Sequence, residues 1–179
     1  MKKLMAVLLT AMLFIASSAY ADGTLEDANK AYASKNYTQA LKLYKPLALK
    51  GEASAQSSLG FMYERGQGVT QDYAEAIKWY KLAAEQGYAY AQNNLGVMYE
   101  RGQGVIQDYV TAHMWYNLAT AQGNKLAEEN RDLVAKKMTP IQIAEAQKLA
   151  KQCLANNYKN CLPLASPPKQ KSNSKKLTM

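Results

Sequence analysis

The feature that most constrains this chain is an internal repeat with a period of 36 residues. Residues 55–90 and 91–126 are identical at 22 of 36 positions when the sequence is shifted by that period. Both copies contain the block Met-Tyr-Glu-Arg-Gly-Gln-Gly-Val, at 62–69 and at 98–105. Tandem units of this length fold by stacking on one another, so the sequence predicts a solenoid. Six residues of an earlier, shorter copy lie 36 positions before their counterparts: Tyr37, Ala40, Tyr44, Lys45, Ala48 and Gly51.

Each unit is predicted to form two antiparallel helices. Asp72 followed by Glu75 is typical of a capping box at the start of the second helix, and the apolar residues that follow recur at helical spacing. Gly66 suits the left-handed residue that ends the first helix. Gly60 removes a side chain where the neighbouring helix must come close. Together these signals predict an all-α chain.

Residues 1–21 are expected to be a secretory signal rather than part of the fold. The basic start, the apolar run from Leu4 to Ala16 and the small residues that follow are typical of such signals. Cleavage is therefore expected between Ala21 and Asp22. An uncleaved membrane anchor is the alternative, but this run is shorter than the roughly 20 apolar residues that span a bilayer. We expect an exported chain, periplasmic or secreted, without stable membrane insertion.

The charge of the chain argues against nucleic-acid binding. The leader contains two of the 22 basic residues, which leaves 22 − 2 = 20 against 14 acidic residues, a net charge of +6. Four lysines lie in residues 162–179, so the body has a net charge of only +2. That tail is rich in Pro, Ser, Lys and Asn and is expected to be disordered. No basic stripe crosses the body, so nucleic acid is not an expected partner.

The repeated pattern resembles the Sel1-like repeat family, a relative of the tetratricopeptide repeats. It reads Ala-Gln-x-x-Leu-Gly-x-Met-Tyr, followed by Gly-x-Gly-Val, Asp-Tyr, Trp-Tyr and a closing Gly, over 55–87 and again over 91–123. The resemblance implies a short right-handed α/α solenoid with a C-terminal capping helix. The expected units are a tetratricopeptide-like hairpin at 22–54, Sel1-like repeats at 55–90 and 91–126, capping helices with a cysteine pair at 127–161, and the basic tail at 162–179.

The resemblance also implies a function in binding rather than catalysis. We expect a non-enzymatic, exported adaptor or scaffold in the cell envelope, whose partner is an envelope or secreted protein. Two alternatives stay open. One is a regulator that binds peptidoglycan or a cell-wall-processing enzyme. The other is weak β-lactam hydrolysis or penicillin binding, which has been linked to cysteine-rich relatives, although the repeats of this chain contain no cysteine.

No catalytic residue, metal ligand or cofactor is expected. The segment 66–68, Gly-Gln-Gly, superficially resembles a phosphate-binding loop, but it follows no predicted strand and recurs at 102–104. Glu64 and Glu100 could be imagined as a carboxylate pair for acid and base chemistry. Because they stand one repeat apart, a surface or salt-bridge position is favoured. His113 is the sole histidine, which favours a packed core position over a metal site.

Cys153 and Cys161 are predicted to form a disulfide in an oxidising compartment. If one helix ran through both, they would lie about 12 Å apart, which is too far for a bond. The bond therefore requires a turn, for which Asn156-Asn157 is suited. The helix before this turn is expected to start at Thr139 as N-cap, with Pro140 as its first residue. A redox-active pair is the alternative.

Six residues on the first helices of the two repeats are predicted to face a partner. Leu59, Met62 and Tyr63 are expected to point inward, which turns other positions of the same helix outward. The resemblance implies that first helices line the concave side of the array. Phe61 and Val97 would then be apolar hot spots, the alternative being that both are core residues. The predicted partner-facing set is Ser57, Phe61, Glu64, Asn93, Val97 and Glu100.

Overall fold

A computed structural model describes residues 23–161, and within this range it contains helices and no strand. The expected leader at 1–21, its cleavage site at Ala21 and Asp22, and the tail at 162–179 lie outside the described residues. None of the helices in 23–161 is both long enough and apolar enough to span a bilayer. The helices are α2 (Leu25–Ala33), α3 (Tyr37–Leu49), α4 (Ala53–Arg65), α5 (Tyr73–Ala84), α6 (Ala89–Arg101), α7 (Tyr109–Ala121), α8 (Lys125–Ala135) and α9 (Pro140–Ala155).

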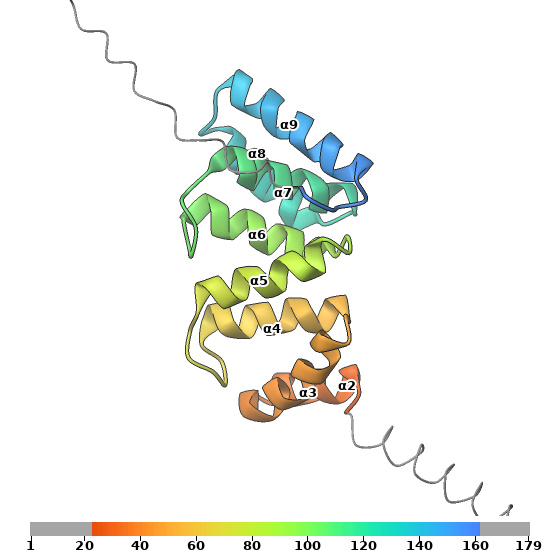
Figure 1. Cartoon of the computed structure of the whole chain (residues 1–179). Coiled ribbons are helices and arrows are strands. Elements are labelled where there is room, and N and C mark those ends of the chain that lie inside the picture. Colours follow the sequence, from red (N-terminus) through yellow and green to blue (C-terminus); the bar gives the residue numbers. More distant parts are fainter. Residues whose placement is uncertain (1–22, 162–179) are drawn as a thin grey trace, which may run out of the picture.

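The helices form a stack that follows the order of the chain, with α2 and α3 at one end and α9 at the other (Figure 1). Each helix from α2 to α7 packs against the next one along the chain. The last unit departs from this plan because both α8 and α9 pack against α7. The predicted all-α solenoid with a C-terminal capping helix is confirmed.

Helix ends follow the predicted signals in part. The Asp72 side chain accepts a hydrogen bond from the Glu75 backbone N–H at 3.0 Å, but the Glu75 carboxylate pairs with Lys78 instead of closing the predicted box. Thr139 makes the full reciprocal box with the third residue of α9. Gly66 ends α4 in the left-handed region, with a φ of 66°. Capping therefore fixes where most second helices start.

The first helices α4 and α6 start two residues before the predicted units at 55–90 and 91–126. Their N-cap residues, Glu52 and Tyr88, make no side-chain capping bond. Buried glutamines hold these starts in place instead. The amide of Gln56 donates to the Ala48 carbonyl at 3.0 Å, and that of Gln92 donates to the Ala84 carbonyl at 3.2 Å. The Ala-Gln pair of the repeat thus ties each first helix to the end of the preceding unit.

Glycine sets the distance between the two helices of a repeat. A Cβ atom on Gly60 would lie 2.8 Å from the ring of Tyr80, which is fully buried. Gly96 makes the same close approach to the ring of Tyr116 in the next repeat. The prediction that Gly60 permits a close helix contact is confirmed.

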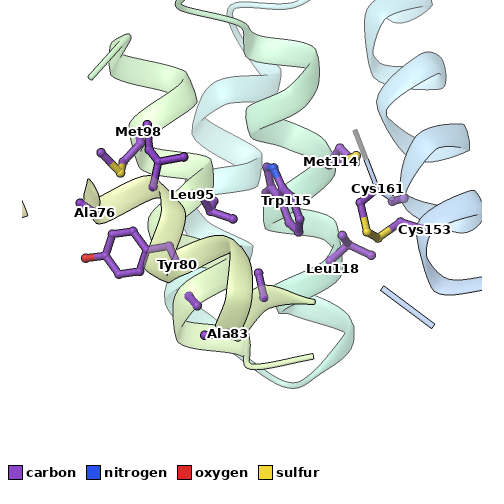
Figure 2. Close-up of a cluster of buried hydrophobic side chains, with 14 residues drawn as sticks. Ala76, Tyr80, Ala83, Leu95, Met98, Met114, Trp115, Leu118, Cys153 and Cys161 are labelled. Atoms are coloured by element: carbon purple, nitrogen blue, oxygen red, sulfur yellow. A yellow bond between two sulfur atoms is a disulfide. The ribbon is translucent and has the colours of Figure 1, made fainter. Parts of the chain in front are cut away.

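The largest buried cluster joins the two repeats to the C-terminal cap. Trp115 on α7 lies between Leu95 of α6 and the Cys153–Cys161 disulfide (Figure 2). Burying an indole of this size contributes roughly 2–3 kcal/mol to folding. The cap therefore completes the core of the second repeat.

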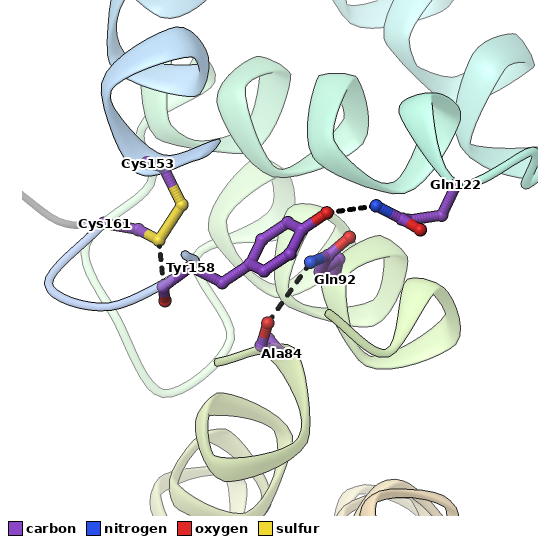
Figure 3. The surroundings of a disulfide bond; sticks show 6 residues. All are labelled: Ala84, Gln92, Gln122, Cys153, Tyr158 and Cys161. Atoms are coloured by element: carbon purple, nitrogen blue, oxygen red, sulfur yellow. Dashed lines mark hydrogen bonds between the residues drawn. A yellow bond between two sulfur atoms is a disulfide. The ribbon is translucent and has the colours of Figure 1, made fainter. Parts of the chain in front are cut away.

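The predicted disulfide closes the end of the fold. Helix α9 ends at Ala155, and the chain turns back through left-handed residues that include Asn157, with a φ of 51°. This turn brings the Cα atoms of Cys153 and Cys161 to 4.6 Å. Between them, Tyr158 lies against Gly87 and its hydroxyl meets the side chain of Gln122 (Figure 3). The short loop thus attaches α9 to the ends of two preceding helices.

Candidate partner-binding surface

The inward side of α4 carries a buried carboxylate. Leu59 and Met62 are buried as predicted, and Tyr63 is half-buried. Glu64 is also buried, and its Oε2 accepts a hydrogen bond of 2.8 Å from the hydroxyl of Tyr80. Burial, followed by the negative charge of Glu64, raises the pKa of Tyr80 far above its ordinary value. The phenol stays protonated and acts as a fixed donor to the carboxylate.

The equivalent carboxylate of the next repeat has a second partner. Glu100 accepts a hydrogen bond of 2.9 Å from the hydroxyl of Tyr116 and forms an ion pair of 2.9 Å with Lys137. The bond to Glu100 is the main cause of a raised pKa at Lys137. Lys137 follows α8, so the cap covers this part of the second repeat.

Three of the six predicted partner-facing residues do not face solvent. Ser57, Glu64 and Asn93 are buried, with exposed fractions of 6%, 8% and 4%. The expectation that they point outward was wrong, because a first helix in the stack is covered on more than one side by neighbouring helices. Glu64 is not a surface position, but the salt-bridge alternative is confirmed, because its Oε1 lies 3.6 Å from Nε of Arg65. The remaining three, Phe61, Val97 and Glu100, are half-buried.

The two repeat boundaries differ at one pair of equivalent positions. At the boundary with the cap, the Asn93 side-chain oxygen accepts a hydrogen bond of 3.0 Å from the amide of Asn130. At the boundary between the two repeats, the equivalents of these residues are Ser57 and Asn94. The serine is shorter, and among the described residues its hydroxyl has no hydrogen-bond partner. This boundary stays open.

A pocket lies at this open boundary, with a volume of about 450 Å³. It draws residues from three successive units, and most of its lining is aromatic. We call it the tyrosine pocket. Its lining residues are Tyr32, Tyr44, Ser57, Ser58, Phe61, Tyr88, Tyr90 and Asn94.

The rings of the tyrosine pocket form two pairs. Tyr32 and Phe61 meet edge to face with centroids 6.5 Å apart, and Tyr88 and Tyr90 are tilted at 5.8 Å. Burial is the main cause that raises the pKa of Tyr88, so its hydroxyl remains a donor at neutral pH. Among the described residues, those that line the pocket include no charged side chain. The guanidinium of Arg65, which is not a lining residue, lies over the Phe61 ring at 5.2 Å from the ring centre. The pocket suits a neutral ligand that is partly apolar.

The histidine lies in the core, as predicted. His113 is 3% exposed, and its Nδ1 lies 2.9 Å from the side-chain nitrogen of Asn117. Burial, with a smaller contribution from Arg131, lowers the pKa of His113. Across residues 23–161, no three His, Cys, Asp or Glu residues are grouped so that they could hold a metal ion.

Comparison with known families decides the class of this protein. A family model described as the Sel1 repeat matches residues 10–52, 53–88 and 89–124, which together make up more than half of the chain. The chain belongs to the Sel1 repeat family. The two matches at 53–88 and 89–124 start at α4 and α6, respectively.

Solved Sel1-type structures agree with this fold. One is a protective antigen present in uropathogenic Escherichia coli strains displaying an SLR fold, with 33% identity and a TM-score of 0.70. It matches over 75% of this chain and 30% of its own length. Another is a Sel1 repeat protein from Oxalobacter formigenes, with 37% identity, a TM-score of 0.55, and coverage of 57% of this chain and 41% of that one.

A curated relative matches over one repeat-sized segment. The ERAD-associated E3 ubiquitin-protein ligase component HRD3 of Candida glabrata is 55% identical over 38 residues, which is 21% of this chain and 5% of that protein. This chain thus spans a small part of the relatives that it matches. Sel1 repeats indicate protein partners in general.

Sequence reasoning found Ser57 and Phe61 in the tyrosine pocket but missed its other lining residues. Tyr90 replaces Ser54 of the preceding Sel1 repeat and is 65% exposed. A large aromatic residue at an exposed, variable position of the repeat was the signal that could have found it. Tyr32 and Tyr44 come from the first unit, and no pattern within one repeat could place them here.

Proposed function

We propose that this Sel1 repeat protein is an exported, non-enzymatic adaptor that binds a protein partner at the tyrosine pocket. The pocket itself carries the proposal. It is a neutral hollow lined by several aromatic rings at the junction of three units, and Tyr90 projects from its edge with 65% of its surface exposed. Tyrosine is enriched among residues that dominate binding energy, because its ring is apolar and its hydroxyl can form a hydrogen bond.

The expected export agrees with the cysteine chemistry. The chain joins Cys153 and Cys161 in a disulfide, a bond that persists in oxidising compartments and is rare in the cytosol. The leader expected at 1–21 would deliver the protein to such a compartment. We therefore place the partner in the periplasm or outside the cell.

The polar groups of the repeats support binding rather than chemistry. Glu64 and Glu100 are engaged by tyrosine hydroxyls, and His113 is packed in the core. The cysteine pair that suggested β-lactam chemistry lies in the cap, outside the matched repeats. A chromogenic β-lactam assay on the full chain should give the rate of buffer alone.

Peptidoglycan is the second candidate partner, because aromatic faces and hydroxyl groups also suit sugars. In this alternative the protein binds peptidoglycan directly or binds a cell-wall-processing enzyme, and it is located at the cell wall. The test that separates the candidates must distinguish a protein from a glycan. Purified sacculi supply the glycan without soluble proteins.

The test is capture from envelope extract by the immobilised full chain. Tyr90→Ser removes an exposed pocket side chain, and Ile106→Ser removes an apolar side chain that is 90% exposed and does not line the pocket. We expect a protein to be captured by the wild type and by Ile106→Ser but not by Tyr90→Ser. Equal capture by all three, or binding to purified sacculi in place of a protein, would overturn the proposal.

A further inference from the structure

We propose that the tyrosine pocket recognises a neutral, proline-rich segment in the polyproline II conformation. This inference rests on the proposed function and specifies the chemistry of the partner. Proline-rich segments dock into grooves lined by aromatic rings, because the preformed polyproline helix loses little conformational entropy on binding. The tyrosine pocket has such a lining, contributed by α2, α4 and the start of α6 among others.

The two aromatic pairs give the pocket two places for a pyrrolidine ring. Tyr32 and Phe61 form one pair, and Tyr88 and Tyr90 form the other. A polyproline helix repeats every three residues with a rise of about 3.1 Å per residue, so one turn covers about 9 Å. The two pairs lie on the first helices of successive units, one on α2 and α4 and the other at the start of α6. Successive turns of such a segment can therefore follow successive units of the array.

The polar groups of the pocket match the backbone of a proline segment. Proline has no backbone N–H, so such a segment presents mainly carbonyl acceptors. Among the described residues, the hydroxyls of Ser57, Tyr88 and Tyr90 have no hydrogen-bond partner. Ser57 is 6% exposed and lines the pocket, and its hydroxyl oxygen keeps accessible surface, so it is a donor available to a ligand in the pocket. A proline carbonyl would satisfy it.

Charge points to the same kind of ligand. The eight lining residues carry no formal charge, and Arg65 lies over the Phe61 ring outside this lining, so a charged side chain inside the pocket would lose its hydration without an ion pair from the lining. Proline rings and backbone carbonyls lose less favourable hydration than a charged group when they enter the pocket. A proline-rich segment therefore fits this pocket better than a charged peptide.

The second repeat boundary supplies a built-in control. There Asn93 is bonded to Asn130, whereas Ser57 leaves the equivalent space open at the first boundary. Ser57→Asn should remove the Ser57 hydroxyl, place a larger side chain in the pocket wall and allow a bond to Asn94. Because the second boundary already contains this pair, the substitution is compatible with the repeat fold.

The test is a titration of the full chain with end-blocked nonaproline, in which NMR measures binding. A glycine-serine peptide of equal length controls for length, and a trimer of N-acetylglucosamine tests for a sugar site. A variant in which Pro163, Pro167 and Pro168 are all serine is titrated in parallel, so that the chain's own prolines cannot compete. Circular dichroism checks that each variant is folded.

We expect nonaproline to saturate and the two control ligands not to bind. Tyr90→Ser and Ser57→Asn should each weaken nonaproline binding at least tenfold, whereas Ile106→Ser should leave it unchanged. If Ser57→Asn fails to fold, Tyr90→Ser still decides the question. No saturation by nonaproline, equal affinity in the Tyr90→Ser variant, or binding of the sugar trimer instead would overturn the assignment. If nonaproline fails while protein capture still depends on Tyr90, the adaptor function stands and only the proline assignment falls.

Discussion

The two Sel1 repeats at 53–88 and 89–124 share one internal frame but present different faces. Each has a glycine against a tyrosine ring and a glutamate that accepts from that tyrosine, at Gly60, Tyr80 and Glu64 in the first repeat. The second repeat is covered by the cap, whose side chains bond to its first helix. The first repeat has no such cover, and the tyrosine pocket lies there. The two repeats thus share one frame, while their boundary residues differ, and the proposed function assigns partner binding to the open boundary.

Removing the disulfide tests whether the cap stabilises only the second repeat or the whole array. Replacing Cys153 and Cys161 together with serine should lower the free energy of unfolding by roughly 2.5 kcal/mol, the value for closing a loop of eight residues. Urea unfolding measures the loss, and hydrogen exchange locates it. Protection should fall in α7 and α9 and persist in α2 and α3. Gln152→Ser, an exposed neighbour, is the control and should change little. A uniform loss of protection along the array would contradict a cap that acts locally.

The tyrosine–glutamate pairs should differ in their contribution to stability. Tyr80→Phe leaves the buried Glu64 with only a longer contact of 3.6 Å to the exposed Arg65 and should cost about 2 kcal/mol. Tyr116→Phe should cost about 1 kcal/mol, because Glu100 keeps its ion pair with Lys137. Thermal and urea unfolding measure both.

Tyr90→Phe is the matched control for these two substitutions, since it removes the hydroxyl of a tyrosine that is 65% exposed. It should leave the free energy of unfolding nearly unchanged. Equal losses from Tyr80→Phe and Tyr116→Phe would show that the cap adds nothing to the second pair.

The smallest expected difference between the repeats is the dependence of the free energy of unfolding on pH. His113 occupies the position of Ile77, and burial holds its pKa below the ordinary value of 6.5. The unfolded chain therefore binds a proton more readily than the folded chain. Stability should be complete above pH 6.5 and decline as the pH falls through the lowered pKa of the folded protein. His113→Ile should flatten this decline in urea unfolding measured from pH 7 to pH 5. An unchanged slope would exclude His113 as its cause.

Much of this architecture could be predicted from the repeat. The period, Gly60, the Asp72 cap and the Thr139 cap each act locally, so their effect can be recognised along the sequence. The disulfide could be predicted because Asn156-Asn157 offers a turn between cysteines eight residues apart.

The binding surface could be predicted only in part. The outward assignment of Ser57, Glu64 and Asn93 treated α4 and α6 as helices with one buried face, whereas neighbours cover them on several sides. The pocket depends on a small difference, serine against asparagine at two boundaries. It also depends on Tyr44, which comes from another unit. Such a juxtaposition arises from stacking and has no signature within one repeat.

The central claim is that the open boundary at Ser57 is the binding surface. Giving each of positions 57 and 93 the residue of the other, in two separate variants, tests this claim most directly. The measurement is partner capture by the full chain from envelope extract, compared for Ser57→Asn and Asn93→Ser at matched thermal stability. We predict that Ser57→Asn loses the captured partner, since the substitution removes the Ser57 hydroxyl and lets the new amide bond to Asn94 in the pocket wall. Asn93→Ser should keep it, although the bond to Asn130 and the long bond of 3.4 Å from the Asn93 amide to Asn94 are lost. Undiminished capture by Ser57→Asn together with loss of capture by Asn93→Ser would place the binding surface at the other boundary and contradict the claim.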